Sequence, residues 1–239
     1  MTPKGPAPAR APASPCGKAV YWRLSETVTA CVAADRILFL DLARDRYFAL
    51  PPVQNDLLIG WLNRPDDQWL AERCRAALSR SRILDPRLAS TVVPAVCAIG
   101  RPSPIDSEPL KPVPVRPGSL LRIAKAVVSA WRDVRSHPLA TVLARRTSHH
   151  GSSVASPSAL QLKLAEFRSA RPFIPVPRVC LHDCLALIDW LGPQRAGVEL
   201  VLGVSPLPFA AHCWVQADGR VLDDHPESPS RYQPILHIP

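Results

Sequence analysis

The sequence predicts an α+β protein with two domains, and three observations support this fold class. Of its 239 residues, 47% are hydrophobic, which is enough to build a core. The stretch from about 94 to 117 is rich in proline and has no helical or alternating periodicity, as is typical of an extended linker. Before this stretch the patterns predict strands followed by helices, and after it they predict helices followed by strands.

The first domain, residues 18–93, begins with strands. Alternating apolar residues predict the strands, and apolar residues at helical spacing predict the helices. A polar turn at 43–46 joins two of the strands into a hairpin. The predicted strands are 19–22, 37–42 and 47–50, and the predicted helices are 54–62 and 69–79. This order indicates a small winged-helix-like module.

The second domain, residues 118–239, is predicted to pack helices on an antiparallel sheet. Ser158 is a candidate N-cap, prolines keep residues 173–177 extended, and Gly192-Pro193 is typical of a helix end. The predicted helices are 120–134, 138–146, 158–169 and about 178–191. The predicted strands are 198–204, a hairpin at 211–224, and 233–238.

The N-terminus and the cysteines indicate the compartment. Residues 1–17 are rich in proline and alanine and lack the apolar segment of a signal peptide, so we expect a disordered tail. No apolar run reaches the roughly 18 residues that span a bilayer. The seven cysteines are scattered and odd in number, which argues against a disulfide framework and favours a cytoplasmic protein.

Cys180 is the candidate nucleophile, because it lies in the first turn of a predicted helix. Amide N–H groups and the helix dipole favour an anion there, so they favour the reactive thiolate. A nearby imidazole would stabilise the thiolate further. The alternative is a buried structural cysteine, which is the usual state of this residue.

Two other thiols permit a metal site. Cys184 lies one helical turn after Cys180 on the same face, and Cys213 is next to His212. These groups could in principle hold a metal ion. Their spacing does not match a zinc knuckle and no second cysteine pair is present, so we expect no metal and no cofactor.

The predicted C-terminal hairpin carries a candidate base, His212, and two candidate carboxylates. A two-residue turn would pair Trp214 with Asp223, whereas a three-residue loop at 217–219 would pair His212 with Asp224. Because glycine suits the left-handed third position of the longer loop, the sequence favours that loop and Asp224. The carboxylate would then orient the imidazole.

Two segments carry a family resemblance. One is Cys180-Leu-His-Asp-Cys-Leu-Ala-Leu187, and the other joins Pro208-Phe-Ala-Ala-His-Cys-Trp-Val215 to Asp218-Gly-Arg-Val-Leu-Asp-Asp224. They resemble the lasso peptide biosynthesis B proteins. These are transglutaminase-like cysteine proteases that remove the leader from a ribosomally made precursor peptide. The resemblance covers about residues 118–239 and implies a papain/transglutaminase-like domain.

The resemblance also implies roles and partners. By position, Cys180 matches the nucleophile, His212 the base and Asp224 the orienting carboxylate. Cys184 falls where the family often has a small hydroxyl residue, and Asp223 where it often has Asn. The implied partners are the precursor peptide and, in the same pathway, an ATP-dependent lasso cyclase similar to asparagine synthetase. The resemblance implies neither a nucleic acid nor a membrane partner.

The first domain resembles the recognition element (RRE) that reads leader peptides in such pathways, similar to the small protein D of pyrroloquinoline quinone biosynthesis. The segment Asp41-Leu-Ala-Arg-Asp-Arg-Tyr-Phe-Ala-Leu50 and the following helix carry this resemblance. A leader would add as a strand at the hairpin edge, where we expect Leu40, Tyr47 and Phe48 to contact it. Tethering would raise the effective concentration of the scissile bond at Cys180.

The charge distribution leaves two other functions open. Residues 1–150 carry 22 Lys/Arg and 12 Asp/Glu, a net +10, whereas residues 151–239 carry 7 and 8, a net −1. The basic half could serve a winged-helix nucleic-acid-binding protein that reads duplexes with arginines of the helix near 69–82. The thiol site could also serve an acyl-transfer transglutaminase, because its chemistry does not fix the acceptor.

Overall fold

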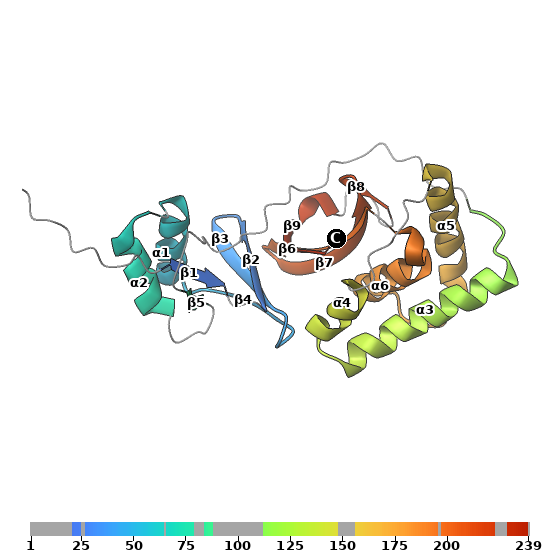
Figure 1. The fold of residues 1–239 in the computed structure, drawn as a ribbon, viewed down its shortest axis with the longest axis horizontal. Coiled ribbons are helices and arrows are strands. Elements are labelled where there is room, and N and C mark those ends of the chain that lie inside the picture. The colour runs from blue at the N-terminus through green and yellow to red at the C-terminus, as the bar shows by residue number, and fades with distance from the viewer. Residues whose placement is uncertain are drawn as a thin grey trace, which may run out of the picture.

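The computed structural model describes residues 21–24, 27–64, 66–78, 84–87, 112–147, 156–195, 197–222 and 229–238 (Figure 1). The predicted tail at 1–17 and the linker residues 94–111 therefore lie outside the described residues. Residues 112–116 are neither helix nor strand, and the next helix begins at Pro117. Among the described helices, none is both long and apolar enough to cross a membrane.

The N-terminal half contains two small sheets and two helices. Strands β2, β3 and β4 form an antiparallel sheet in that order, and β1 pairs with β5. The predicted hairpin is confirmed, with Leu40 opposite Tyr47. A winged-helix-like arrangement is not established by these elements. They are β1 (Tyr21–Leu24), β2 (Val28–Ala33), β3 (Arg36–Asp41), β4 (Arg46–Ala49), α1 (Pro52–Asn63), α2 (Gln68–Leu78) and β5 (Leu84–Arg87).

Strand β2 was not predicted from the sequence, and the reason lies in its turn. Ala34 and Asp35 connect β2 to β3 with φ angles of 47° and 58°. Two consecutive residues in this left-handed region make the tight hairpin turn that suits twisted strands. Glycine is the usual residue in this conformation and alanine is rare there. Because this turn contains no glycine, the sequence does not indicate it.

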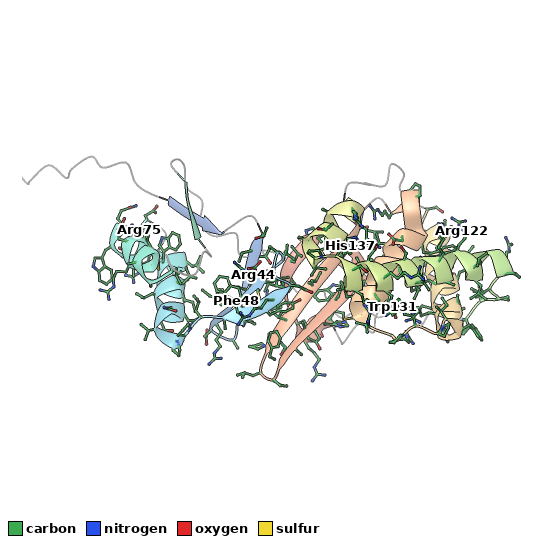
Figure 2. The ribbon with its side chains drawn as sticks, turned by 90° about the horizontal axis from the view of Figure 1, so that it is seen from below. Arg44, Phe48, Arg75, Arg122, Trp131 and His137 are labelled. Atoms are coloured by element: carbon green, nitrogen blue, oxygen red, sulfur yellow. The ribbon has the colours of Figure 1, made fainter. Side chains whose placement is uncertain are left out.

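The sheet β2–β4 separates two apolar layers, because successive side chains along a strand point to opposite faces. One face packs on α1 and α2, and Phe48 stacks on Phe39 there with ring centroids 5.0 Å apart. The other face belongs to the same apolar core as the C-terminal half. Its residues are Cys31, Ala33, Leu38, Leu40 and Tyr47. Figures 1 and 2 show this sheet between the two helices and the C-terminal strands.

The C-terminal half is mixed helix and sheet, as predicted. Helix α6 is buried along most of its length and contacts α3, α5 and β7. The sheet is antiparallel with strand order β8-β7-β6-β9. The elements are α3 (Pro117–Ser136), α4 (Leu139–Thr147), α5 (Pro157–Ala170), a 3-10 turn (Arg171–Phe173), α6 (Cys180–Leu191), a 3-10 turn (Gly192–Gln194), β6 (Val198–Pro206), β7 (Phe209–Ala217), β8 (Arg220–Val221), a 3-10 turn (Pro229–Arg231) and β9 (Gln233–Ile238).

Two local predictions need correction. The N-cap of α5 is Ser156, whose Oγ accepts a hydrogen bond from the Ala159 amide, and not Ser158. Pro157 occupies the first helical position, where its missing N–H costs nothing, and this moves the start of the helix forward. Phe173, the first residue of the predicted extended segment, is instead the last residue of a 3-10 turn that begins at Arg171.

Candidate active site

Cys180 is the first residue of α6, and its side chain is half-buried. No side chain caps this helix end, since Val179 occupies the N-cap position. The first amide groups of α6 are therefore not capped by a side chain, and a helix end of this kind favours an anion. The sequence-based placement of Cys180 in a first helical turn is confirmed.

A buried arginine organises the chain that leads to Cys180. Arg171 is only 2% exposed, and its Nε donates to Asp183 Oδ1 at 2.7 Å. Its two other nitrogens donate to the carbonyl oxygens of Ile174, Val176 and Pro177 at 3.0–3.2 Å. The guanidinium thus ties the entry segment to the first turn of α6. A buried charge is tolerated when it is paired and fully hydrogen-bonded in this way.

Cys184 and Cys213 join the helix to the strand that carries His212. The Cys184 thiol donates to the Cys213 carbonyl oxygen at 3.3 Å, and both side chains are buried. This contact lies one helical turn after Cys180 and one residue after His212. The structure therefore brings the two predicted catalytic segments together. Within the described ranges, no group of three His, Cys, Asp or Glu is placed to hold a metal ion.

His212 lies in the middle of β7, opposite Gly203 of β6. Its ring lies 5.1 Å from the Tyr232 ring and 6.2 Å from the Trp214 ring, measured between centroids. Strand alternation places His212 on the same face as Trp214, whereas Cys213 belongs to the face that packs on α6. The imidazole and the Cys180 helix are thus on neighbouring elements but approach the sheet from different faces.

The turn of the C-terminal hairpin contradicts the predicted three-residue loop. Ala217 pairs with Arg220, so only Asp218 and Gly219 form the turn. Both have positive φ angles, 50° and 72°. Aspartate tolerates this conformation, and Asp-Gly is a preferred two-residue turn, which explains the shorter loop.

The candidate carboxylates, Asp223 and Asp224, lie outside the described residues. The described strand pairing ends at Val221, although the Leu222 amide still donates to Val215 at 2.8 Å. The three-residue loop was the geometric argument for Asp224, and this argument no longer holds. Only the positional resemblance now favours Asp224 over Asp223.

The three predicted leader-binding residues differ in accessibility. Leu40 is completely buried against the C-terminal half, so it offers no surface to a peptide, and its predicted direct contact needs correction. Leu40 lies on the predicted strand, but its side chain points into the core that this sheet shares with the C-terminal half. Tyr47 and Phe48 are half-buried and lie on β4, the outer strand of the three-stranded sheet.

Tyr47 reaches the candidate active site from the N-terminal sheet. Its ring lies 5.7 Å from the Phe209 ring at the start of β7. Burial raises the pKa of the Tyr47 phenol, and the proximity of Cys213, Asp45 and Cys180 raises it further, because neighbouring negative charge disfavours a phenolate. This proximity has no local sequence signal, since Tyr47 and Cys180 are distant in the chain.

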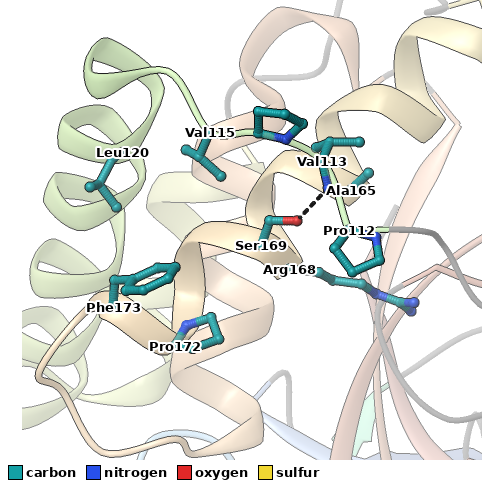
Figure 3. Close-up of a pocket in the computed structure, with 10 residues that line it drawn as sticks. Pro112, Val113, Val115, Leu120, Ala165, Arg168, Ser169, Pro172 and Phe173 are labelled. Atoms are coloured by element: carbon teal, nitrogen blue, oxygen red, sulfur yellow. Dashed lines mark hydrogen bonds between the residues drawn. The ribbon is translucent and has the colours of Figure 1, made fainter.

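An apolar groove of about 700 Å³ lies near the start of α3 and the end of α5 (Figure 3). The Val113 amide donates to Ser169 Oγ at 3.0 Å and holds the extended chain over the helix. Arg168 lines the groove and donates to the carbonyl oxygen of Leu222 at 3.1 Å. None of the described lining residues carries a thiol or an imidazole, so the groove is distinct from the Cys180 site.

The arginines considered for nucleic-acid binding are partly engaged. The Arg73 guanidinium lies 4.7 Å above the Trp69 ring, and Arg75 pairs with Glu72 at 2.7 Å. The other two arginines of that prediction, at positions 80 and 82, lie outside the described residues.

Comparison with known protein families gives a match for the C-terminal half of the chain. Residues 121–237 match the transglutaminase-like superfamily, so this part of the chain is a transglutaminase-like domain. The match contains Cys180, His212 and the segment with the two aspartates. This class of fold serves cysteine peptidases and acyl-transfer enzymes, and the match extends neither to the lasso peptide subfamily nor to a leader-recognition element. Searches of curated proteins and of solved structures found no match.

Proposed function

We propose that this chain is a lasso peptide maturation protease that binds the leader of a ribosomal precursor and cleaves it from the core. The observation that carries the proposal is the position of Cys180. It begins a buried helix whose next turn is hydrogen-bonded to the strand of His212. A superfamily of cysteine peptidases and acyl-transfer enzymes matches this region.

The proposed reaction proceeds through a thioester. The Cys180 thiolate attacks the scissile carbonyl carbon and forms a C–S bond, while the amide nitrogen leaves with a proton from the His212 imidazolium. Water then attacks the thioester and gives a proton to His212, and the thiolate leaves. Asp224 is proposed to orient the imidazole. Because His212 and the helix of Cys180 lie on different faces of the sheet, this mechanism requires a rearrangement that brings the imidazole to the thiol.

The proposed leader site is the outer edge of β4. Within the described sheet, β4 pairs only with β3, so its other edge offers backbone N–H and C=O groups to an added strand. The N-terminal sheet also contacts the C-terminal core directly. A leader bound at β4 would therefore be held close to Cys180, and we propose that the released core passes to an ATP-dependent lasso cyclase.

The test is a search for a short precursor gene next to the gene of this chain, and then cleavage of its product, followed by mass spectrometry. Cys180→Ala should lower the cleavage rate on the order of 10³-fold or more, because the covalent path is lost. His212→Ala should be about as severe, whereas Cys184→Ala should stay active, since Cys184 is a buried packing residue. An active Cys180→Ala variant together with a dead Cys184→Ala variant would show that the nucleophile is misassigned.

Acyl transfer is the second candidate, because the superfamily match does not choose between water and an amine as acceptor. The same assay separates the two functions when it contains a primary amine such as putrescine. A peptidase yields free acid at the new C-terminus. A transferase yields the amine adduct, which differs in mass.

A further inference from the structure

The surroundings of Cys180 include a residue from the other half of the chain. Tyr47 lies on β4, opposite Leu40, and its side chain faces the C-terminal core. Its neighbour Phe48 points the other way and stacks on Phe39. Tyr47 is therefore turned away from α1 and α2 and towards the transglutaminase-like domain.

Tyr47 lies near the nucleophile, since the thiols of Cys180 and Cys213 are close enough to act electrostatically on its phenol. Tyr47 packs against Phe209, with ring centroids 5.7 Å apart and planes tilted by 58°. Phe209 and Cys213 share one face of β7, and the Cys213 carbonyl oxygen accepts the hydrogen bond from Cys184, one turn after Cys180. Tyr47 and Cys180 both pack at the margin of the same core.

Large apolar side chains are exposed on both segments that lead to this region, the start of β7 and the residue before Cys180. Phe209 is 54% exposed, Leu207 beside it is 74% exposed, and Val179, directly before Cys180, is 42% exposed. Exposed large apolar residues that gather beside a reactive group mark a binding surface. Polar or charged substrate side chains would gain nothing there, whereas an apolar side chain would be shielded from water.

We propose that Tyr47 and Phe209 form an apolar subsite beside Cys180 that receives an apolar side chain flanking the scissile bond of the substrate peptide. Tyr47 is then a specificity-determining residue, and the N-terminal sheet completes the active site in addition to binding the leader. The assignment of a peptide as the occupant rests on the proposed function. The existence of the subsite does not, because it can be probed with small thiol reagents.

The experiment compares N-phenylmaleimide with N-methylmaleimide on the full chain. Rates of Cys180 alkylation are measured by mass spectrometry of the Cys180 peptide, and glutathione corrects for the intrinsic reactivity of the reagents. In the wild type, an aromatic subsite should favour the phenyl reagent. Tyr47→Ala and Phe209→Ala should each lower this preference by about threefold to tenfold, the range expected for loss of one aromatic contact.

Two controls make the outcome specific. Tyr47→Phe should keep the preference, because the ring remains. Trp69→Ala should also keep it, since Trp69 is an exposed aromatic residue on α2. If Tyr47→Ala does not fold, the test uses Tyr47→Leu together with Phe209→Ala, because Phe209 is exposed and its substitution leaves the core intact. An unchanged preference in folded Tyr47 and Phe209 variants overturns the subsite. Failure of precursor cleavage with an intact reagent preference would instead overturn only the peptidase proposal.

Discussion

Removal of the Arg171 guanidinium is expected to destabilise the protein strongly and to disable the nucleophile. Arg171→Ala deletes four hydrogen bonds at once, one to Asp183 and three to backbone carbonyl oxygens of residues 174–177. The three carbonyl groups and the carboxylate lose a donor that is only 2% exposed. Because this segment leads directly into α6, the position of Cys180 depends on it.

The expected loss can be estimated from burial. Breaking a buried ion pair by removing one partner costs about 3–5 kcal/mol, since the remaining charge is left uncompensated. Asp183 is 17% exposed and has the exposed Arg178 at 3.7 Å as a weaker second partner. Water and Arg178 can therefore compensate part of the loss. The free energy of unfolding should fall by about 3 kcal/mol, the lower end of this range.

Urea unfolding followed by tryptophan fluorescence measures this change, with Arg75→Ala as the matched control. Arg75 forms an ion pair with Glu72 at 2.7 Å, but both side chains are about half exposed. Such surface pairs contribute about 0–1 kcal/mol. If Arg171→Ala lowers the free energy of unfolding by less than about 1 kcal/mol, or by as little as Arg75→Ala does, the structural role assigned to Arg171 is refuted. The midpoint should shift without a change in the m-value if only stability is affected.

Three further predictions concern the sheet, the tyrosine and the carboxylates. Gly203→Ala should lower the melting temperature, because a Cβ there would lie 2.7 Å from the Trp214 ring and overpacking costs about 1–3 kcal/mol; an unchanged melting temperature would contradict this packing. Burial raises the pKa of Tyr47 above its ordinary 10.0, so the folded state keeps a proton that the unfolded chain loses. Stability should therefore fall as the pH rises above about 10, and Tyr47→Phe should reduce that slope in urea unfolding. Asp224→Asn should slow precursor cleavage by about 10²-fold or more and Asp223→Asn by less, and the reverse order in a cleavage assay would reassign the carboxylate.

The features that the sequence could predict are those with a local signal. The helix of Cys180 ends at Leu191, directly before Gly192 with its φ of 58°, and the hairpin 37–50 has a polar turn between apolar strands. Strand β2 was not predicted, because the turn that follows it consists of Ala34 and Asp35 and contains no glycine. The C-terminal hairpin was predicted, but the predicted loop was one residue longer than the observed turn of Asp218 and Gly219, because the argument gave the left-handed conformation to glycine alone whereas Asp218 adopts it too.

The missed parts of the site depend on tertiary packing. Arg171 carries no local sequence signal of its role, because its four acceptors become neighbours only when the chain turns into α6. Tyr47 was assigned to a peptide-binding edge from its strand position, but alternation alone does not say which face meets another half of the chain. The burial of Leu40 has the same origin.

The two halves of the chain share one apolar core, which limits how independently they can fold or separate. The predicted boundary at about 94–117 suggests separable domains, and residues 94–111 lie outside the described part of the chain. Leu38 and Leu40 are at most 5% exposed, and they are buried against the C-terminal half. Full burial of a leucine side chain contributes about 1.5–3 kcal/mol, so two such residues alone would cost several kcal/mol to separate.

Proteolysis within the linker should therefore yield a nicked complex and not two freely separating pieces. Size-exclusion chromatography after limited proteolysis measures this, because both fragments should elute together and separate only in denaturant. Leu38→Glu places a charge in the shared layer and should cause the nicked fragments to elute apart, whereas Trp69→Ala on the opposite side of the module should not. Fragments that separate without denaturant would show that the shared layer is too weak to couple the leader-binding sheet to Cys180. In that case tethering, and not packing, would have to bring the scissile bond to the nucleophile.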